Sequence, residues 1–500
     1  MLTRAEIKRY LEREPKVADM ICSLKAISKQ PKAMTKETEE VVALARRFND
    51  QVVRPRIADL DRTMEADPDF LPHDFVAEAN RWGLYTLWIP KIFGGRGYNL
   101  PSLSYFIEEI SSACVAMANL IGVHYLGVGA LIASWQTPII QRVFSEVVVG
   151  ERSVKPCLIS LALTSPEAGT DMQETALMDQ GNMTCLARKV DGGYEVNGTK
   201  VFISNGHLST WHILIAFADL DRPSANLVVL AVKTGMPGFS FGRREHKMGQ
   251  KGCPASELIF DDCFVPDENV CFDPTQAGKL KRTPSQTTMQ LIDYLMAASR
   301  TAVGAFGTGV ARGAFEAALH FAAETEVEGK FLINHGWAQS MLAQMYHNVL
   351  VSRYAYVEGN YAVGIDGMYR LLQLKPLYYM IRYLPKAILQ KLVPELMNRS
   401  LGTWLMRKIH CDGQSEEQIQ RTSGLGSMAK FCGTDAAVKN GHMALDLMGQ
   451  AGLQQERLAE KHFRDAKLLQ IYEGTNQLNR LNLFKCLIAR GYPQAQVFVD

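Results

Sequence analysis

Three stretches with different hydrophobic patterns follow one another along the chain. From about residue 36 to 156, apolar residues recur at helical spacing, as in ETEEVVALARRFNDQVV and HDFVAEANRWGLYTLWI. Residues 157–285 contain short β-rich runs such as WHILIAFADL and NLVVLAVKT, separated by Gly, Pro, Asn and Asp. Residues 286–500 return to long helical patterns. The sequence therefore predicts an α+β multidomain protein with a helical domain, a β-domain or barrel, and a second helical domain.

Two segments near the N-terminus need separate interpretation. Residues 1–35 are mixed and basic, and we expect a helical extension there. From Ile110 to Gln141 the chain has no Asp, Glu, Lys or Arg, which is long enough to cross a bilayer. Because polar residues and glycines interrupt this stretch, we favour buried helices of the first domain over a transmembrane span.

The composition is that of an ordinary globular protein. The 500 residues are 47% hydrophobic and 21% charged, with a formal net charge of +2. There is neither a bulk positive field nor a nucleic-acid-binding motif, so we expect no nucleic-acid partner. The ten cysteines form no CxxC pair and fit no metal-ligand spacing. We therefore predict no metal site, and a reduced, cytoplasmic protein without a signal segment.

A basic and aromatic segment, at about residues 366–418, interrupts the second helical domain. Residues 366–410 contain eight Lys or Arg and two acidic residues, a net charge of +6. Pro376, Pro385 and Pro394 predict that no single helix runs through the segment. Basic, aromatic and apolar residues together favour peripheral contact with a membrane or a partner. The alternative is a helical excursion packed on its own chain or on a neighbouring subunit.

Glu473 is the most informative single residue. It stands between Tyr472 and Gly474, and apolar surroundings raise the pKa of a carboxyl because desolvation disfavours its charged form. Such a Glu can act as a general base near neutral pH, and the glycine lets a substrate approach the backbone closely. Taken alone, a Glu before Gly is more often an ordinary helix-end residue.

Three motifs together resemble those of the acyl-CoA dehydrogenases, in particular the bacterial fatty-acid β-oxidation branch. They are RDAKLLQIYEGTNQLNR, LTSPEAGTD at residues 163–171 and FISNG at residues 202–206. The resemblance covers about residues 40–360 and 420–490. It implies a helical N-terminal domain, a middle β-barrel domain, a C-terminal helical bundle, FAD as cofactor, and a homodimer or homotetramer. No Rossmann GxGxxG or P-loop is present, so the usual dinucleotide fingerprint would not hold the flavin.

The resemblance also implies roles for individual residues. Glu473 would remove the α-proton, and Ser299, at a place where some relatives carry their catalytic Glu, leaves Glu473 as the one matching base. The implied substrate contacts are Thr170, Arg300, Tyr472 and Gly474. The implied FAD contacts are Leu163, Thr164, Gly169, Thr170, Phe202, Ser204, His335, Asp446, Gly449, Thr475 and Gln477.

The sequence departs from the family pattern at the adenine end of the expected flavin site. Thr325 and Glu328 stand where the family has an Arg and a Phe, and Asp446 replaces a Gln that the partner subunit supplies. An acidic residue near a pyrophosphate repels it unless it is protonated or turned away. We therefore expect FAD binding with a rearranged adenine end.

The implied activity is α,β-desaturation of a fatty acyl-CoA to the trans-2-enoyl-CoA, with electrons passed to an electron-transferring flavoprotein. Two alternatives stay open. One is an acyl-CoA oxidase, which passes the electrons to oxygen. The other is a flavin-poor, membrane-associated binding protein, which the departures at the adenine end suggest. The length and branching of the acyl group are also open.

Overall fold

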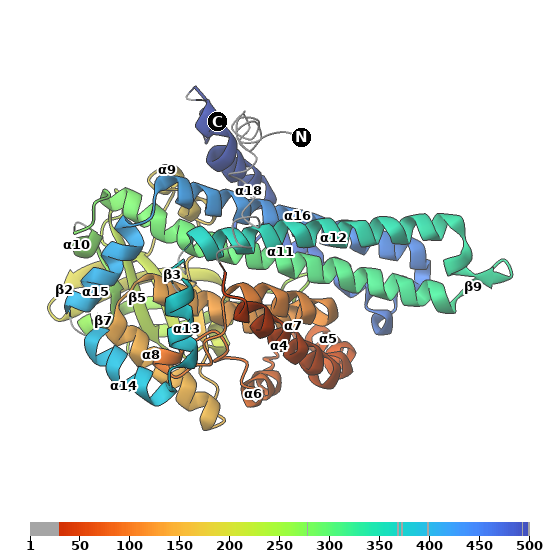
Figure 1. Cartoon of the computed structure of the whole chain (residues 1–500), viewed down its shortest axis with the longest axis horizontal. Coiled ribbons are helices and arrows are strands. Elements are labelled where there is room, and N and C mark those ends of the chain that lie inside the picture. The colour runs from red at the N-terminus through yellow and green to blue at the C-terminus, as the bar shows by residue number, and fades with distance from the viewer. Residues whose placement is uncertain are drawn as a thin grey trace.

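The computed structural model describes residues 30–277, 279–367, 370–371, 374–397, 400–492 and 494–498. The extension predicted at residues 1–35 falls almost entirely outside these ranges. The chain forms helices, then a sheet, then helices again, which is the predicted order (Figure 1).

Helices form the N-terminal part of the fold. They are α4 (Ala33–Phe48), α5 (Ile57–Ala66), α6 (His73–Arg81), α7 (Pro101–Ala133) and α8 (Thr137–Arg152). By length and composition α7 could cross a bilayer, but 83% of its most apolar stretch is buried inside the protein. Cys114 has extended backbone angles (φ −156°, ψ 109°), so α7 is two helices joined at a kink. Both observations agree with buried core helices.

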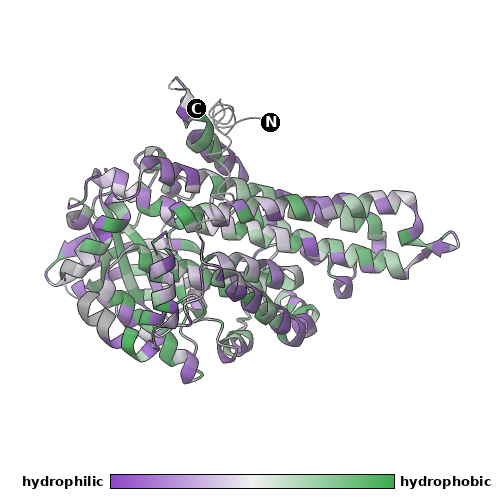
Figure 2. Ribbon diagram, viewed as in Figure 1, coloured by the Kyte–Doolittle hydropathy of each residue, from purple (hydrophilic) through white to green (hydrophobic). Residues whose placement is uncertain are grey.

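The middle part is an eight-stranded, mostly antiparallel sheet. Its strands are β1 (Ile159–Ala162), β2 (Leu186–Val190), β3 (Gly193–Ser204), β4 (Trp211–Phe217), β5 (Leu227–Lys233), β6 (Phe239–Arg244), β7 (Ala255–Pro266) and β8 (Val270–Phe272). The order is β6-β7-β3-β2-β4-β5-β8, and β1 pairs in parallel with β4. The path of strands ends at β6 and β8, and β1 branches from it at β4, so the middle domain is an open sheet. Apolar residues concentrate in these strands and where helices pack together (Figure 2).

Three long helices form the C-terminal bundle: α11 (Pro284–Glu324), α12 (Gly336–Asp366) and α16 (Glu416–Met448). They extend side by side to a small hairpin of β9 (Glu326–Val327) and β10 (Lys330–Phe331) at the far tip (Figure 1). Glycines allow α11 and α16 to touch: a Cβ on Gly307 would lie 2.4 Å from the carbonyl oxygen of Gly433. The Ala- and Gly-rich sequence of α11 predicted this close packing.

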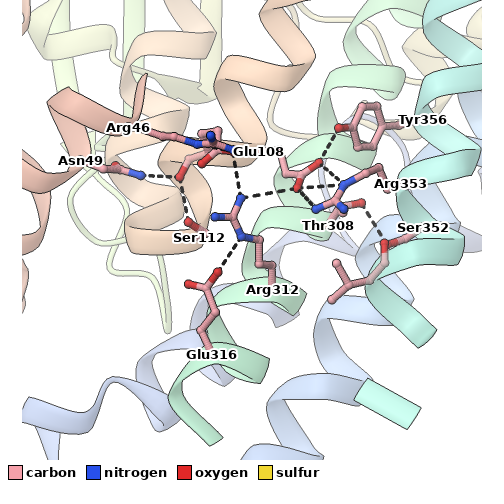
Figure 3. Close-up of polar contacts among 12 residues, drawn as sticks. Arg46, Asn49, Glu108, Ser112, Thr308, Arg312, Glu316, Ser352, Arg353 and Tyr356 are labelled. Atoms are coloured by element: carbon pink, nitrogen blue, oxygen red, sulfur yellow. Dashed lines mark hydrogen bonds and ion pairs between the residues drawn. The ribbon is translucent and has the colours of Figure 1, made fainter. Parts of the chain in front are cut away.

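A buried ionic network ties the N-terminal helices to the bundle (Figure 3). Glu108 on α7 accepts a hydrogen bond from Arg353 Nε on α12 at 3.0 Å. The adjacent Glu109 pairs with Arg312 of α11 at 3.1 Å and with Arg46 of α4 at 2.9 Å. One charged cluster therefore joins four helices, α4, α7, α11 and α12.

The basic segment forms three short helices: α13 (Lys375–Tyr383), α14 (Lys386–Met397) and α15 (Ser400–Arg407). Pro376 lies in the first turn of α13, and Pro385 lies between α13 and α14. Pro394 lies inside α14 and does not end it. The segment is thus not one helix, as expected, although only two of the three prolines stand at a helix boundary.

Basic residues of this segment bind other parts of the same chain. Arg382 forms an ion pair with the buried Glu37 of α4. Arg407 is only 8% exposed, and its guanidinium donates hydrogen bonds to the carbonyl oxygens of Ser134 and Cys271, both at 2.9 Å. These contacts favour the alternative in which the insertion packs on its own chain.

Candidate active site

The candidate base lies in a tight loop between α17 (Ala459–Leu469) and α18 (Asn476–Leu483). Glu473 and Gly474 both have left-handed backbone, with φ of 56° and 79°. The Thr475 hydroxyl caps α18 by accepting a hydrogen bond from the Leu478 N–H at 3.2 Å. A Cβ on Gly474 would lie 2.7 Å from the Leu478 side chain, so this position requires glycine. A non-glycine residue with positive φ is typical of a functional site, where the surroundings hold the strain.

Glu473 lines a cavity of about 580 Å³ where the N-terminal helices, the sheet and the C-terminal bundle meet. Ten of the predicted residues come together in its wall: Leu163, Thr164, Gly169, Thr170, Phe202, Ser204, Tyr472, Glu473, Gly474 and Thr475. The rest of the wall includes apolar side chains of α7 and α11, among them Leu103, Ile107, Leu126, Ala302, Val303 and Phe306. The cavity thus joins a polar end, which holds the carboxylate, to an apolar space suited to an acyl chain.

The carboxyl of Glu473 has the properties of a base. Burial raises its pKa, and the Ser299 hydroxyl, Arg300 and Lys430 oppose the increase only in part. Its Oε2 atom is buried without a hydrogen-bond partner among the described residues. An unpartnered carboxylate oxygen in a cavity is available to accept a proton from a bound molecule.

The polar end fits a planar ring with hydrogen-bonding edges. Phe202 has positive φ (58°), is 57% exposed and lines the cavity, so its ring is free to cover a flat ligand. Hydroxyl groups of Thr164, Thr170 and Ser204 lie in the same wall, where they can donate to or accept from ring nitrogens and carbonyls.

Sequence reasoning missed the residue that supports this wall. Lys200 is fully buried, and its Nζ donates to the carbonyl oxygen of Leu163 at 2.7 Å and to the Ser165 hydroxyl at 3.1 Å. It therefore holds the loop that carries Thr164 and Thr170. Lys200 is buried in β3 together with Tyr194 and Val196. The sequence does not single it out, because lysine is rarely buried and a strand pattern alone does not show its partners.

Arg300 is close to the site but does not line the cavity. We expected it to contact the substrate, yet it is 2% exposed on α11. Its Nε donates to the carbonyl oxygen of Glu473 at 3.2 Å, and Nη2 donates to Gln173 Oε1 at 2.9 Å. Its observed contacts therefore hold the loop that carries the base.

The remaining predicted FAD contacts lie outside the cavity wall. Asp446 and Gly449, at the end of α16, and Gln477, in the first turn of α18, are exposed to solvent. A ring nitrogen of His335 lies 3.0 Å from the carbonyl oxygen of Val327 in the tip hairpin. None of these four residues lines the cavity that holds Glu473. Among the described residues no cluster of His, Cys, Asp or Glu is arranged to hold a metal ion.

Family models match most of the chain. The acyl-CoA dehydrogenase N-terminal, middle and C-terminal domains match residues 35–146, 160–263, and 289–360 with 406–488. The chain belongs to the acyl-CoA dehydrogenase family. The predicted family and architecture are thereby confirmed, and with them a flavoprotein oxidoreductase. The unmatched residues between 360 and 406 overlap most, but not all, of the segment at about residues 366–418 that we predicted as an insertion.

Individual relatives agree over nearly the whole chain. A Mycobacterium leprae protein named probable acyl-CoA dehydrogenase is 25% identical over 456 residues, 91% of this chain and 96% of its own. Butyryl-CoA dehydrogenase from Megasphaera elsdenii has a similar structure, with a TM-score of 0.67 and 21% identity over 90% of this chain and 98% of its own. A chain in a structure described as electron transferring flavoprotein of Acidaminococcus fermentans has a TM-score of 0.68 and 22% identity over 90% of this chain and 98% of its own.

Proposed function

We propose that this acyl-CoA dehydrogenase desaturates a fatty acyl-CoA between its α- and β-carbons, with Glu473 as the base. The observation that carries the proposal is the Glu473 carboxyl, whose free Oε2 lines a cavity with an apolar extension. In the proposed step Oε2 takes the α-proton, and the electron pair left behind spreads toward the thioester oxygen. The backbone N–H of Glu473 would stabilise the charge that develops on that oxygen.

FAD is the cofactor that the cavity fits. Thr164, Thr170, Phe202 and Ser204 would hold the flavin ring, and Thr475 would contact it beside the base. FAD supplies the acceptor for the hydride that leaves the β-carbon. This chain contributes the raised pKa of Glu473, the apolar walls that exclude water, and the donors that orient the thioester.

The predicted FAD contacts outside the cavity would serve a second copy of the chain. His335, Asp446 and Gly449 lie toward the tip of the bundle, and Gln477 is exposed at the start of α18. In a homodimer or homotetramer this surface would reach the adenine half of the FAD bound by the partner. We also propose that the adenine end of the FAD site is rearranged. Glu328, which stands where the family has a Phe, is exposed and has left-handed backbone with φ of 50°.

We further propose that the enzyme works in the cytoplasm and passes its electrons to an electron-transferring flavoprotein. The similarity to a chain from the Acidaminococcus fermentans structure supports this choice of acceptor. The oxidase and the flavin-poor binding protein are the alternatives that the test must separate.

The test supplies the FAD-loaded protein with a series of saturated acyl-CoAs and follows the products by mass spectrometry. With an artificial electron acceptor we expect an enoyl-CoA that has lost two hydrogens, and no oxygen uptake in the absence of the acceptor. Rapid oxygen uptake would instead identify an oxidase. A protein that binds acyl-CoA but neither holds FAD nor forms product would support the binding-protein alternative.

A second proposal concerns the insertion, whose outer face we propose to contact an anionic membrane. Its helices lie along the outer surface beside the N-terminal helices and the sheet (Figure 1). Tyr383 is 71% exposed, Met380 50% and Trp404 43%, and the exposed Lys391 adds positive charge. We expect sedimentation with phosphatidylglycerol vesicles and not with phosphatidylcholine vesicles, and weaker sedimentation at high salt. Failure to sediment with either kind of vesicle would leave packing on the chain as the role of the insertion.

A further inference from the structure

The loop that carries Glu473 rests on a buried lysine. Lys430 on α16 is 0% exposed. Its Nζ donates to the carbonyl oxygen of Gly474 at 2.8 Å and to Asn476 Oδ1 at 2.6 Å. A fully buried ammonium group is costly to desolvate. Its contact with the residue that follows the candidate base therefore suggests a role for the lysine at this loop.

Lys430 belongs to a set of three donors that hold consecutive carbonyl groups. Arg300 donates to the carbonyl oxygen of Glu473 at 3.2 Å, and Lys430 donates to that of Gly474. The Asn479 amide nitrogen lies 2.9 Å from the carbonyl oxygens of Gly474 and Thr475. The Thr475 carbonyl also accepts the backbone N–H of Asn479 at 3.0 Å. Glu473 and Gly474 are left-handed, so their carbonyls lie outside the helix and depend on these buried side chains.

We propose that Lys430 is a positioning residue for Glu473: its hydrogen bonds fix the left-handed turn, and its positive charge favours the proton-free form of the base. This inference rests on the proposed function, because it assigns Lys430 a role relative to the base of the desaturation. Lys430 does not line the cavity and would not touch the substrate.

The charges around Lys430 agree with this role. Arg300 from α11, Glu473 from the loop, Asp435 from α16 and Arg480 from α18 all act on it. Burial lowers the pKa of Lys430 to about 7. The lysine is thus mostly charged on the acid side of neutrality. In that range its charge lowers the pKa of Glu473, against the increase caused by burial.

Three substitutions separate the hydrogen bonds of Lys430 from its charge. Lys430→Gln keeps an N–H donor and removes the charge, Lys430→Met removes both, and Lys430→Arg keeps the charge. Lys439→Gln is the matched control, because Lys439 lies on the same helix and is exposed. Each FAD-loaded variant is compared with wild type in the pH dependence of kcat/KM. A second comparison is the infrared titration of the Glu473 carboxyl band, which Glu473→Gln identifies.

We expect kcat/KM of Lys430→Gln to fall on the order of tenfold on the acid side and to change little at alkaline pH, because an adjacent opposite charge shifts a carboxyl pKa by about one unit or more. The infrared midpoint should move to higher pH in the Gln and Met variants and stay near that of wild type in the Arg and Lys439 variants. Lys430→Met should also lose kcat at every pH.

Profiles and infrared midpoints of the Gln and Met variants that superimpose on wild type would overturn the inference. If one of these two variants fails to fold, the other alone tests whether the charge of Lys430 lowers the pKa of Glu473. The proposed function fails separately, because it fails when wild-type protein forms no enoyl-CoA, whatever the Lys430 variants show in the infrared.

Discussion

Replacing Glu108 by Gln tests the charged cluster that joins the N-terminal helices to the C-terminal bundle. Glu108 is 4% exposed and accepts hydrogen bonds from Arg353 through Nε, 3.0 Å from Oε2, and through Nη2, and another from the Tyr356 hydroxyl. Glutamine keeps the shape and one acceptor but removes the charge. Two arginines then lose a counter-charge inside the protein: Arg353, and Arg312, whose Nη1 lies 3.8 Å from Glu108 Oε1.

The expected cost follows from burial. Breaking a buried ion pair by removing one partner costs about 3 to 5 kcal/mol. Because the Arg353 side chain is 32% exposed, water can solvate part of its charge, and we expect a loss of about 2 to 3 kcal/mol for Glu108→Gln. With an unfolding entropy of about 2 cal/mol/K per residue, a chain of this length should then melt roughly 2 to 3 °C lower.

Scanning calorimetry measures this shift, and Glu316→Gln is the matched control from the same cluster. The Glu316 side chain is 31% exposed and accepts a hydrogen bond from Arg312 Nε at 2.7 Å. Its loss should cost less than about 1 kcal/mol, because Arg312 retains Glu109. Equal melting temperatures for the two variants would refute the argument that burial, and not charge alone, gives this cluster its strength.

Other predictions concern the base, the loop, the cavity and the insertion. The folded-state pKa of Glu473 lies above its unfolded value, so the stability linked to its proton is present in acid and lost as pH rises through the folded pKa. Glu473→Gln should therefore raise the free energy of unfolding in urea at pH 8 and not at pH 4, and an equal effect at both would contradict this reasoning. Gly474→Ala should lower kcat at least about tenfold, because its φ of 79° disfavours alanine and the added Cβ has no space; unchanged kcat would show that the loop tolerates another shape. Phe202→Ala should speed the loss of FAD on dialysis with no change in the melting temperature of the FAD-free protein, and unchanged retention would remove Phe202 from the flavin site. Arg407→Met should cost about 3 kcal/mol in thermal unfolding, because the buried carbonyls of Ser134 and Cys271 lose their side-chain donor, whereas Lys391→Met, at an exposed position, should cost nothing measurable; similar costs would contradict the packing of the insertion.

The fold was largely predictable because its elements follow their local patterns. The helical spacing before residue 156 and the β-rich runs after it correspond to α4–α8 and β1–β8. The run without charges in α7 was rightly interpreted as buried helix. The strand order and the two ends of the sheet could not be read from the sequence, because they depend on pairing between strands far apart in the chain.

The candidate site was predictable where a motif is local. The strings around Thr164, Phe202 and Glu473 converge on one cavity, although each was recognised separately. Lys430 and Lys200 were missed because a buried lysine within a helix or strand has no local signature. The observed contacts of Arg300 were missed for the same kind of reason: its partners lie at residues 173 and 473, and only the folded chain brings them together.

The insertion shows the limit of composition as evidence. Its basic and aromatic residues suggested a surface for a membrane or partner, and exposed residues such as Tyr383 keep that proposal open. Composition could not show that Arg382 and Arg407 turn inward to Glu37 and to backbone carbonyls. A charged side chain can face solvent, contact lipid or bind its own chain, and its tertiary neighbours determine which of these occurs.

The most direct test of the central claim is anaerobic mixing of the FAD-loaded protein with a saturated acyl-CoA, followed through the visible absorption of the flavin. Wild type should lose this absorption rapidly with at least one chain-length class. Glu473→Gln should bind the same acyl-CoA and retain FAD, yet bleach at least about a thousandfold more slowly, since it lacks the proton acceptor. Bleaching of the Gln variant at the wild-type rate would contradict the assignment of Glu473 as the base.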